Sequence, residues 1–473
     1  MSKVYICTAI PYVNGNPHLG HSMDYLLADT YARYRRLLGD EVRFQVGTDE
    51  HGNKVFSTAE KHDIPVEQYV QENSDKFRKF IDDLDVSYTD FIRTTDPNHV
   101  HACQEIWKKL EPHIYSAEYD GWYCEGCERF VTEKEYEDNH GICPDHQRAY
   151  EHLSEKNYYL RISDFKDQIR AAIESDTMKI TPAFRKQEVL KLLEDAPDIS
   201  ISRPRKQLSW GVPVPGDEDQ IMYVWVDALS NYITALGYPD DPAALDFWPA
   251  TAQFIGKDIL RFHAITWPAI LLGIGLELPQ NLVVHGYILA NGQKMSKSIG
   301  NVVDPMEVLS RKGLPAFRYY FLRHVDNFDD SDFTDEKYEN AYNNELANDL
   351  GNLVQRLATL CKKNHVSGVK ITPDLDSKFC ELMDQFEFAR ALDYVWAQVQ
   401  NLNKQIDEAK PWELAKNGET EKVQSVLQDL EQGILEVAFQ LQIFLPETSA
   451  KITAIFSAEE VTPPAEPLFP KAR

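Results

Sequence analysis

The chain has 473 residues, more than one compact core holds, so we expect about two to four domains. A hydrophobic content of 43% is typical of a globular protein, and no apolar run approaches the roughly 18 residues that a membrane-spanning helix needs. The formal net charge of −26 argues against diffuse electrostatic binding of nucleic acid, but Arg356, Lys362, Lys363 and Lys370 form a local basic cluster.

The N-terminus and the cysteines favour a reducing compartment. Residues 1–7 lack the layout of a signal peptide, because a strand-like run is soon followed by Pro11 and Asn14. Of the seven cysteines, four are scattered and form no disulfide framework, namely Cys7, Cys103, Cys361 and Cys380. We therefore expect a cytoplasmic protein that does not contact a membrane.

Residues 4–52 have the pattern of a strand–loop–helix–strand unit. A buried strand at 4–8 is followed by turn residues at 11–17 and by a helical pattern from about 21 to 38, which Gly39 ends. A second strand at 41–46 leads into the loop 47–52. Ligands bind at the carboxyl ends of such strands, so this unit predicts a nucleotide-type site.

The middle of the chain interrupts and then resumes this pattern. Residues 116–150 are rich in turns and aromatic residues, and the mixed helical segment 152–222 follows. Residues 222–227 and 253–258 have the apolar character of returning strands or strand ends, and 281–289 is predicted as another strand. The nucleotide-binding fold is therefore expected to be split by an insertion.

The last third of the chain is predicted to be helical. Helical periodicity covers 337–364, 374–408 and 418–445, which favours an antiparallel bundle. A short proline-rich tail follows the bundle.

Two short motifs carry groups that suit phosphate chemistry. In His18-Leu19-Gly20-His21, two imidazoles lie where a strand hands over to a helix N-terminus, and Gly20 leaves room for a base. In Lys294-Met295-Ser296-Lys297-Ser298, two lysines on a polar loop suit the charge of a pyrophosphate leaving group. Each motif alone also fits an ordinary turn or a solvated basic loop. Their occurrence together and in this order favours function.

Between these motifs lies a pattern typical of a structural zinc site. Cys124 and Cys127 form one pair of ligands, and after fifteen intervening residues Cys143 and His146 form a second. Four such ligands fill a tetrahedral Zn²⁺ and leave no open position. His140 is a rival fourth ligand, and accidental spacing is the remaining alternative.

The order of HLGH, zinc knuckle and KMSKS resembles the class I aminoacyl-tRNA synthetases, and among them the methionyl-tRNA synthetases. The resemblance extends over nearly the whole chain, including residues 201–215 and 318–320. It departs at 324–330, which is more acidic and poorer in glycine than the family pattern. It implies a substrate set of ATP, L-methionine and tRNA-Met, with Mg²⁺ accompanying ATP and one structural Zn²⁺ per chain.

The resemblance also assigns roles to particular residues. His18, His21, Lys294 and Lys297 would stabilise the transition state of amino-acid adenylation. These four residues, together with Gly20, Gly256 and Asp258, would bind ATP. Asp49 would bind the substrate ammonium, although without the family motif an Asx turn is the better explanation of this residue. The remaining predicted methionine-binding residues are Ile10, Tyr12, Trp225, Ala228, Leu229, Tyr232, Phe262, His263 and Trp267; without the resemblance they are better explained as core.

Three residues of the helical part match the positions that read the anticodon in this family. Asn352 and Arg356 lie one helical turn apart, and Trp412 follows Pro411 at a helix start. Amide, guanidinium and indole groups suit splayed RNA bases, although a capped helix with a core tryptophan is the structural alternative.

We therefore predict an α/β fold: a split Rossmann-like nucleotide-binding domain with a zinc-knuckle insertion, followed by an α-helical bundle. The expected divisions are 1–115 and 223–335 for the catalytic domain, 116–222 for the insertion, 336–460 for the anticodon-binding domain and 461–473 for the tail. The sequence lacks the appended tRNA-binding domain that dimerises some members, so we expect a monomer.

Two other functions compete with methionine–tRNA ligase. A small HxGH nucleotidyltransferase is disfavoured by the chain length and by the helical region, and a non-catalytic tRNA-binding paralogue is disfavoured by the intact motifs. Within the synthetases, the insertion is too short for the editing enzymes. Among the synthetases, the cysteine-specific enzyme is the most similar alternative because it also binds zinc, but in that enzyme the zinc lies in the active site.

Overall fold

A computed structural model describes residues 2–124, 127, 129–145, 147–290, 292–295 and 301–470, leaving aside the side chains of Tyr119, Arg129 and Glu155. Its centre is a six-stranded parallel sheet in the order β3-β2-β1-β12-β13-β7. The strands are β1 Lys3–Thr8, β2 Glu41–Thr48, β3 Asp90–Arg93, β7 Lys179–Thr181, β12 Ala252–Gly256 and β13 Asn281–His285. The order reverses beside β1, where a ligand crevice is expected at the carboxyl ends.

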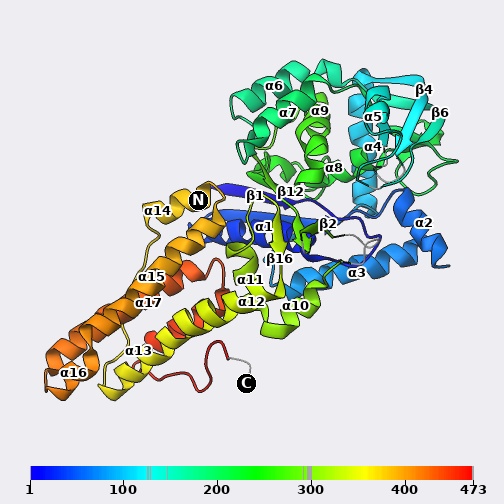
Figure 1. Cartoon of the computed structure of the whole chain (residues 1–473). Coiled ribbons are helices and arrows are strands. Elements are labelled where there is room, and N and C mark those ends of the chain that lie inside the picture. Colours follow the sequence, from blue (N-terminus) through cyan, green and yellow to red (C-terminus); the bar gives the residue numbers. More distant parts are fainter. Residues whose placement is uncertain are drawn as a thin grey trace.

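Alternate residues of β1 enter two different cores, as the two-residue period of a strand requires. Val4 and Ile6 pack in the core on the side of helix α1, whereas Tyr5 and Cys7 pack in the core on the opposite side. The helices around the sheet are α1 Leu19–Leu37, α2 Asn53–Lys61, α3 Val66–Asp83, α4 Pro97–Leu110, α8 Val224–Thr234 and α9 Trp267–Gly273. The split α/β fold predicted from the sequence is confirmed (Figure 1).

The inserted segment is built on a long antiparallel hairpin that the sequence pattern did not predict. Strand β4 Ile114–Cys124 pairs with β6 Glu151–Leu160. The other elements of the segment are β5 Arg129–Val131, α5 Glu133–Asp138, α6 Lys166–Glu174, α7 Arg185–Glu194, β8 Ile199–Ser200, β9 Ser202–Pro204, β10 Pro213–Val214 and β11 Asp217–Met222. Strand β7 of this segment pairs with β13, so residues 116–222 contribute one strand to the main sheet.

The prediction of a strand or strand end at 222–227 is wrong for most of this segment. Strand β11 ends at Met222, and helix α8 begins at Val224. A short apolar run is compatible with either state, and here nearly every side of the helix is buried, so no polar face marks its period. The expected strands at 253–258 and 281–289 correspond to β12 and to the pair β13 and β14 Ile288–Ala290.

A small second sheet presents the lysine motif. Strands β15 Gln293–Lys294 and β16 Ser331–Phe333 flank β14. Helices α10 Pro305–Lys312 and α11 Leu314–Arg323 lead from this sheet toward the helical part. Buried Arg318 on α11 joins the parts, because its guanidinium donates to Asp29 of α1 at 2.7 Å and to the Phe444 carbonyl at 2.7 Å.

The C-terminal region is the predicted helical bundle, and it extends away from the catalytic sheet with α16 at its far end (Figure 1). The predicted helix 374–408 is two helices, because the chain turns at Phe386 with a φ of +60°. The bundle consists of α12 Asp335–Asn340, a π-helical segment Ala341–Gly351, α13 Asn352–Lys363, α14 Ser377–Asp384, α15 Phe388–Ala409, α16 Pro411–Lys416, α17 Thr420–Leu441 and α18 Pro446–Phe456.

The proline-rich tail packs back on this region. Val461 and Phe469 are buried, and the Tyr342 hydroxyl donates to the Pro470 carbonyl at 2.7 Å. Among the described residues, none of the helices has the length and apolar character to cross a membrane.

Candidate active site and metal site

The HLGH motif forms the N-terminal cap of α1. The Nδ1 atom of His18 accepts from the Gly20 amide at 3.1 Å, and Nδ1 of His21 accepts from the His18 amide at 3.1 Å. The two rings stack with centroids 3.7 Å apart. Since each Nδ1 is an acceptor, a neutral ring carries its hydrogen on Nε2. The cap therefore fixes two imidazoles at the positive end of a helix, which suits an anionic ligand.

Two glycines in the predicted ATP region leave no room for a side chain. A Cβ atom on Gly20 would lie 2.9 Å from Cε1 of His18, and one on Gly256 would lie 2.8 Å from Oδ1 of Asp258. Close approach of a ligand to the backbone is possible at both positions.

These residues border a cavity of about 1260 Å³ at the carboxyl ends of the central strands. It brings together segments that lie more than 200 residues apart in the chain. Its lining includes almost all of the predicted substrate residues described by the structure, namely Ile10, Tyr12, His18, Gly20, His21, Asp49, Trp225, Ala228, Leu229, Tyr232, Gly256, Asp258, Phe262, His263 and Lys294.

One wall of the cavity consists of aromatic side chains on α8 and on the π-helical turn Phe262–Thr266. The rings of Trp225 and Phe262 stack at 3.9 Å. The Tyr232 hydroxyl is 2.7 Å from Nε2 of His263, whose Nδ1 is 3.0 Å from the Ile259 carbonyl. Burial lowers the pKa of His263 to about 4, so the ring is neutral near pH 7. This wall is apolar and uncharged, as a thioether requires.

Trp267 is placed behind this wall and does not line the cavity. It is fully buried, and its ring lies 5.7 Å from that of Tyr232. Its role in this structure is to support the tyrosine.

A second part of the cavity lining carries Asp49. Its amide donates to the Pro11 carbonyl at 2.9 Å, and its carbonyl accepts from the Val13 amide at 3.1 Å. This parallel bridge holds Tyr12 and Asp49 side by side at the cavity. Asp49 is 3% exposed, which places an acidic group in a nearly dry part of the site.

The first lysine of the KMSKS motif also reaches the cavity. Nζ of Lys294 lies 4.0 Å from the centroid of the Tyr287 ring, a cation–π contact. Lys297, the second predicted lysine, lies outside the described residues.

The cavity contains an ion pair that the sequence reasoning missed. Nε2 of His285 is 2.9 Å from Oδ1 of Asp24, and Nδ1 of His285 is 2.8 Å from the Gly286 carbonyl. Both ring nitrogens face acceptors. Burial acts to lower the pKa of His285, but Asp24, the Gly286 carbonyl and Asp258 together raise it above its usual value. The sequence did contain an indication of this pair, since Asp24 follows His21 by one helical turn and His285 lies within the predicted strand 281–289.

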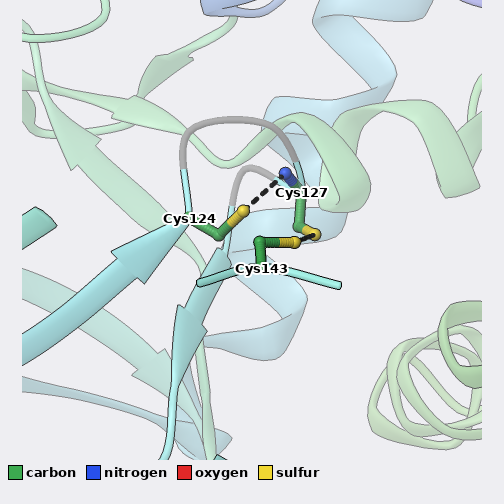
Figure 2. Close-up of side chains that lie close together, drawn as sticks. All are labelled: Cys124, Cys127 and Cys143. Carbon is green, nitrogen blue, oxygen red and sulfur yellow. Dashed lines mark hydrogen bonds between the residues drawn. The ribbon is translucent and has the colours of Figure 1, made fainter. Parts of the chain in front are cut away.

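The three predicted cysteine ligands converge (Figure 2). Sγ of Cys127 is 3.6 Å from Sγ of Cys143, and the Cys127 amide is 3.3 Å from Sγ of Cys124. Two thiolates on one tetrahedral zinc would be about 3.8 Å apart, given Zn–S bonds of about 2.3 Å. His146 lies outside the described residues, and His140 is exposed in a left-handed turn with a φ of 53°.

The crowding of these cysteines disfavours their ionised forms in the absence of a cation. The pKa of the Cys127 thiol lies far above its usual range, because Cys124 hydrogen bonds to it, the site is buried and Cys143 adjoins it. A bound divalent cation would instead stabilise the thiolates. The donor set and its spacing therefore fit Zn²⁺.

Two of the three predicted anticodon residues, Arg356 and Trp412, lie in contact in the bundle. The Arg356 guanidinium lies 5.1 Å from the Trp412 ring and bonds to Asp407 at 2.6 Å. Trp412 is 40% exposed and is therefore not a core residue. Asn352 lies one turn before Arg356 on α13 and is exposed.

Comparisons with known proteins agree with this geometry. A family model described as "tRNA synthetases class I (M)" matches residues 4–153 and 146–358. The chain is 37% identical to the methionine–tRNA ligase of Thermotoga maritima, over 97% of this chain and 76% of that protein. It is 38% identical to the methionine–tRNA ligase of Brucella melitensis biotype 1, over 96% and 92% respectively.

A solved structure also covers the whole fold. The Mycobacterium tuberculosis methionyl-tRNA synthetase in complex with methionyl-adenylate matches with a TM-score of 0.92 and 33% identity, covering 100% of both chains. The chain therefore belongs to the methionine–tRNA ligase family of class I aminoacyl-tRNA synthetases.

Proposed function

We propose that this enzyme activates L-methionine with ATP and transfers the methionyl group to tRNA-Met. The observation that carries the proposal is that the capped His18–His21 pair, buried Asp49 and the Trp225–Tyr232 wall all line one cavity. Methionine–tRNA ligases are the relatives that match across nearly the whole chain.

In this proposal the amino acid binds between the two walls of the cavity. The Asp49 carboxylate binds the ammonium group, and the apolar wall with Trp225 and Phe262 receives the thioether. His263 is neutral, so it adds no charge beside the sulfur. The remaining pocket residues supply shape.

The nucleotide binds beside the helix cap. Asp258 accepts from ribose hydroxyls, and Gly20 and Gly256 allow the backbone to approach the nucleoside. His18, His21, Lys294 and Lys297 hold the phosphates. Mg²⁺, when bound with ATP, neutralises part of the phosphate charge.

No protein nucleophile takes part in the proposed reaction. The methionine carboxylate oxygen attacks the α-phosphorus, the bond from this phosphorus to the bridging oxygen breaks, and pyrophosphate leaves with the electron pair. The protein positions the reactants and stabilises the developing charge through Nε2–H groups, the helix N-terminus and the two lysines.

The other assignments remain parts of the same proposal. Cys124, Cys127, Cys143 and His146 hold one structural zinc, with His140 as the weaker candidate. Asn352, Arg356 and Trp412 read the anticodon. We propose residues 1–115 with 223–335 as catalytic domain, 116–222 as insertion, 336–460 as anticodon-binding domain and 461–473 as tail, in a monomeric cytoplasmic enzyme.

ATP–pyrophosphate exchange measured with each of the twenty amino acids tests the function. Methionine should stimulate exchange far above the others, and charging of tRNA-Met should follow. Stronger stimulation by cysteine, leucine or isoleucine would refute the specificity. Absence of exchange with every amino acid would refute the activity.

A further inference from the structure

Behind the proposed methionine pocket lies a buried carboxylate held between two histidines. Oδ2 of Asp227, on α8, is 2.7 Å from Nδ1 of His51, and Oδ1 is 2.8 Å from Nε2 of His99. The Asp227 side chain is 1% exposed. The other nitrogen of His99 is 2.7 Å from the Thr234 hydroxyl. The Asp227 carboxylate is thus buried, and each of its oxygens is hydrogen-bonded to one histidine.

The carboxylate is ionised in this position. Burial alone would raise the pKa of Asp227, but its contacts with His51 and His99 lower it to about 2. A buried charge keeps its place only through such partners, so the removal of one partner leaves a costly unpaired group.

The spacing identifies the cluster as a hydrogen-bonded network rather than a metal centre. His99, Cys103 and Asp227 offer ligand atoms within 4.8 Å of one another, but the nitrogen–oxygen separation of 2.8 Å is a hydrogen-bond distance. Nitrogen and oxygen ligands on a tetrahedral zinc would be about 3.3 Å apart, given bonds of about 2.0–2.1 Å.

On the His51 side, the network continues into the loop that carries Asp49. The loop is fixed at three successive residues. Glu50 forms an ion pair with Arg93 at 2.7 Å, His51 contacts Asp227, and the Gly52 amide donates a hydrogen bond to the Trp210 carbonyl at 3.3 Å. The Trp210 indole also donates to the Glu50 carbonyl at 2.7 Å.

On the Asp227 side, the network continues into the aromatic wall on α8. Trp225, Ala228 and Leu229, which line the cavity, lie within two residues of Asp227 on the same helix. His51 does not line the cavity and cannot touch a ligand there. The hydrogen bond between His51 and Asp227 therefore directly connects the two walls of the amino-acid pocket, and we call this connection the strut.

We propose that Asp227, acting through His51, is a positioning residue that sets the distance between the Asp49 carboxylate and the α8 wall, and thereby the affinity for the amino acid. The proposal rests on the proposed function, in which these walls hold methionine. His99 anchors the same carboxylate to α4, away from the loop, and its role is structural.

This division gives a matched pair of variants. His51→Gln and His99→Gln each remove one imidazole from the same carboxylate, and each should lower the thermal stability of the full-length enzyme. In ATP–pyrophosphate exchange, His51→Gln should raise the KM for methionine about tenfold or more, with the KM for ATP within about twofold of wild type. His99→Gln should leave both KM values within about twofold.

Asp227→Asn should raise the KM for methionine as His51→Gln does. The double variant that combines His51→Gln with Asp227→Asn should have a methionine KM no higher than that of Asp227→Asn alone, because the same hydrogen bond is lost in both cases. If Asp227→Asn does not fold, the two histidine variants decide. An unchanged methionine KM in His51→Gln, or an equal rise in His99→Gln, would overturn the proposal. If the wild-type enzyme shows no methionine-dependent exchange, the proposed function fails instead. The strut is then tested by calorimetry, which compares the affinity of wild type and of His51→Gln for whichever amino acid the wild type binds.

Discussion

Arg356 and Trp412 lie against each other at the far end of the bundle, with the guanidinium 5.1 Å from the centroid of the indole ring. The contact joins α13 to the short helix α16 and leaves the tryptophan 40% exposed. Asp407 holds the same guanidinium at 2.6 Å and so limits its orientation. An exposed ring supported by a fixed cation is a suitable stacking surface for an unpaired base.

We expect Trp412→Ala to separate the two half-reactions. Loss of one base-stacking plane costs about 1–3 kcal/mol, so charging of tRNA-Met should fall by roughly 10- to 100-fold. Exchange of pyrophosphate into ATP needs no tRNA and should stay near wild type. Phe184→Ala, which removes an exposed aromatic ring from the inserted segment, is the control and should leave both activities unchanged. Equal charging of an anticodon-altered tRNA by the wild-type enzyme would contradict anticodon reading here.

The converging cysteines predict a metal whose removal damages the inserted segment first. Elemental analysis should give about one zinc per chain, and Cys127→Ser should reduce that content and lower the thermal midpoint of the enzyme. Cys380→Ser is the matched control, since Cys380 is also partly buried but lies in the helical bundle. Retention of full zinc by Cys127→Ser, or a chelated enzyme of unchanged stability, would contradict the assignment.

His21 and Lys294 are expected to act mainly in the transition state. Removal of one electrostatic donor of this kind costs about 2–4 kcal/mol, so His21→Ala and Lys294→Ala should each lower the adenylation rate by roughly 30- to 1000-fold. The KM for methionine should change little. Lys363→Ala, on the bundle, serves as the control for loss of a lysine. A variant that changed only the methionine KM would contradict this role.

Much of the site was predictable because its residues belong to contiguous motifs at the ends of elements with a clear period. The turn residues before α1 and Gly39 after it located this helix. The rule that ligands bind at the carboxyl ends of parallel strands placed His18, Asp49 and Asp258 at the same edge of the sheet. The structure confirms the fold that this reasoning predicted, and it places fifteen of the predicted substrate residues around one cavity.

The remainder depended on contacts that a local pattern does not encode. The pairing of β4 with β6 joins residues on either side of the cysteine segment, and β7 reaches the main sheet from within the insertion. The start of α8 was missed because nearly all of its faces are buried, so the apolar run had no polar side. Trp267 was expected at the ligand, but it is fully buried and does not line the cavity.

The neutral state of His263 makes a prediction about acid stability. The ring donates to the Ile259 carbonyl through Nδ1 and accepts from the Tyr232 hydroxyl at Nε2. A second proton would reverse the hydrogen bond with Tyr232 and place a charge in a buried wall. The folded-state pKa of about 4 lies below the ordinary value of 6.5. As the pH falls below about 6.5, His263 therefore binds a proton in the unfolded chain, whereas in the folded chain it does so only near pH 4. The folded state should lose stability across this window and regain it as the pH rises.

The magnitude follows from the size of the pKa shift. A difference of about 2.5 units corresponds to roughly 3 kcal/mol of unfolding free energy, lost between pH 6.5 and 4. Unfolding curves at a series of pH values should show a smaller acid loss in His263→Gln than in wild type, because glutamine does not titrate. His101→Gln removes a half-exposed imidazole instead and should run parallel to wild type. Other titrating groups are common to all three proteins and cancel in the comparison. Parallel curves for wild type and His263→Gln would mean that this histidine does not resist protonation in the fold.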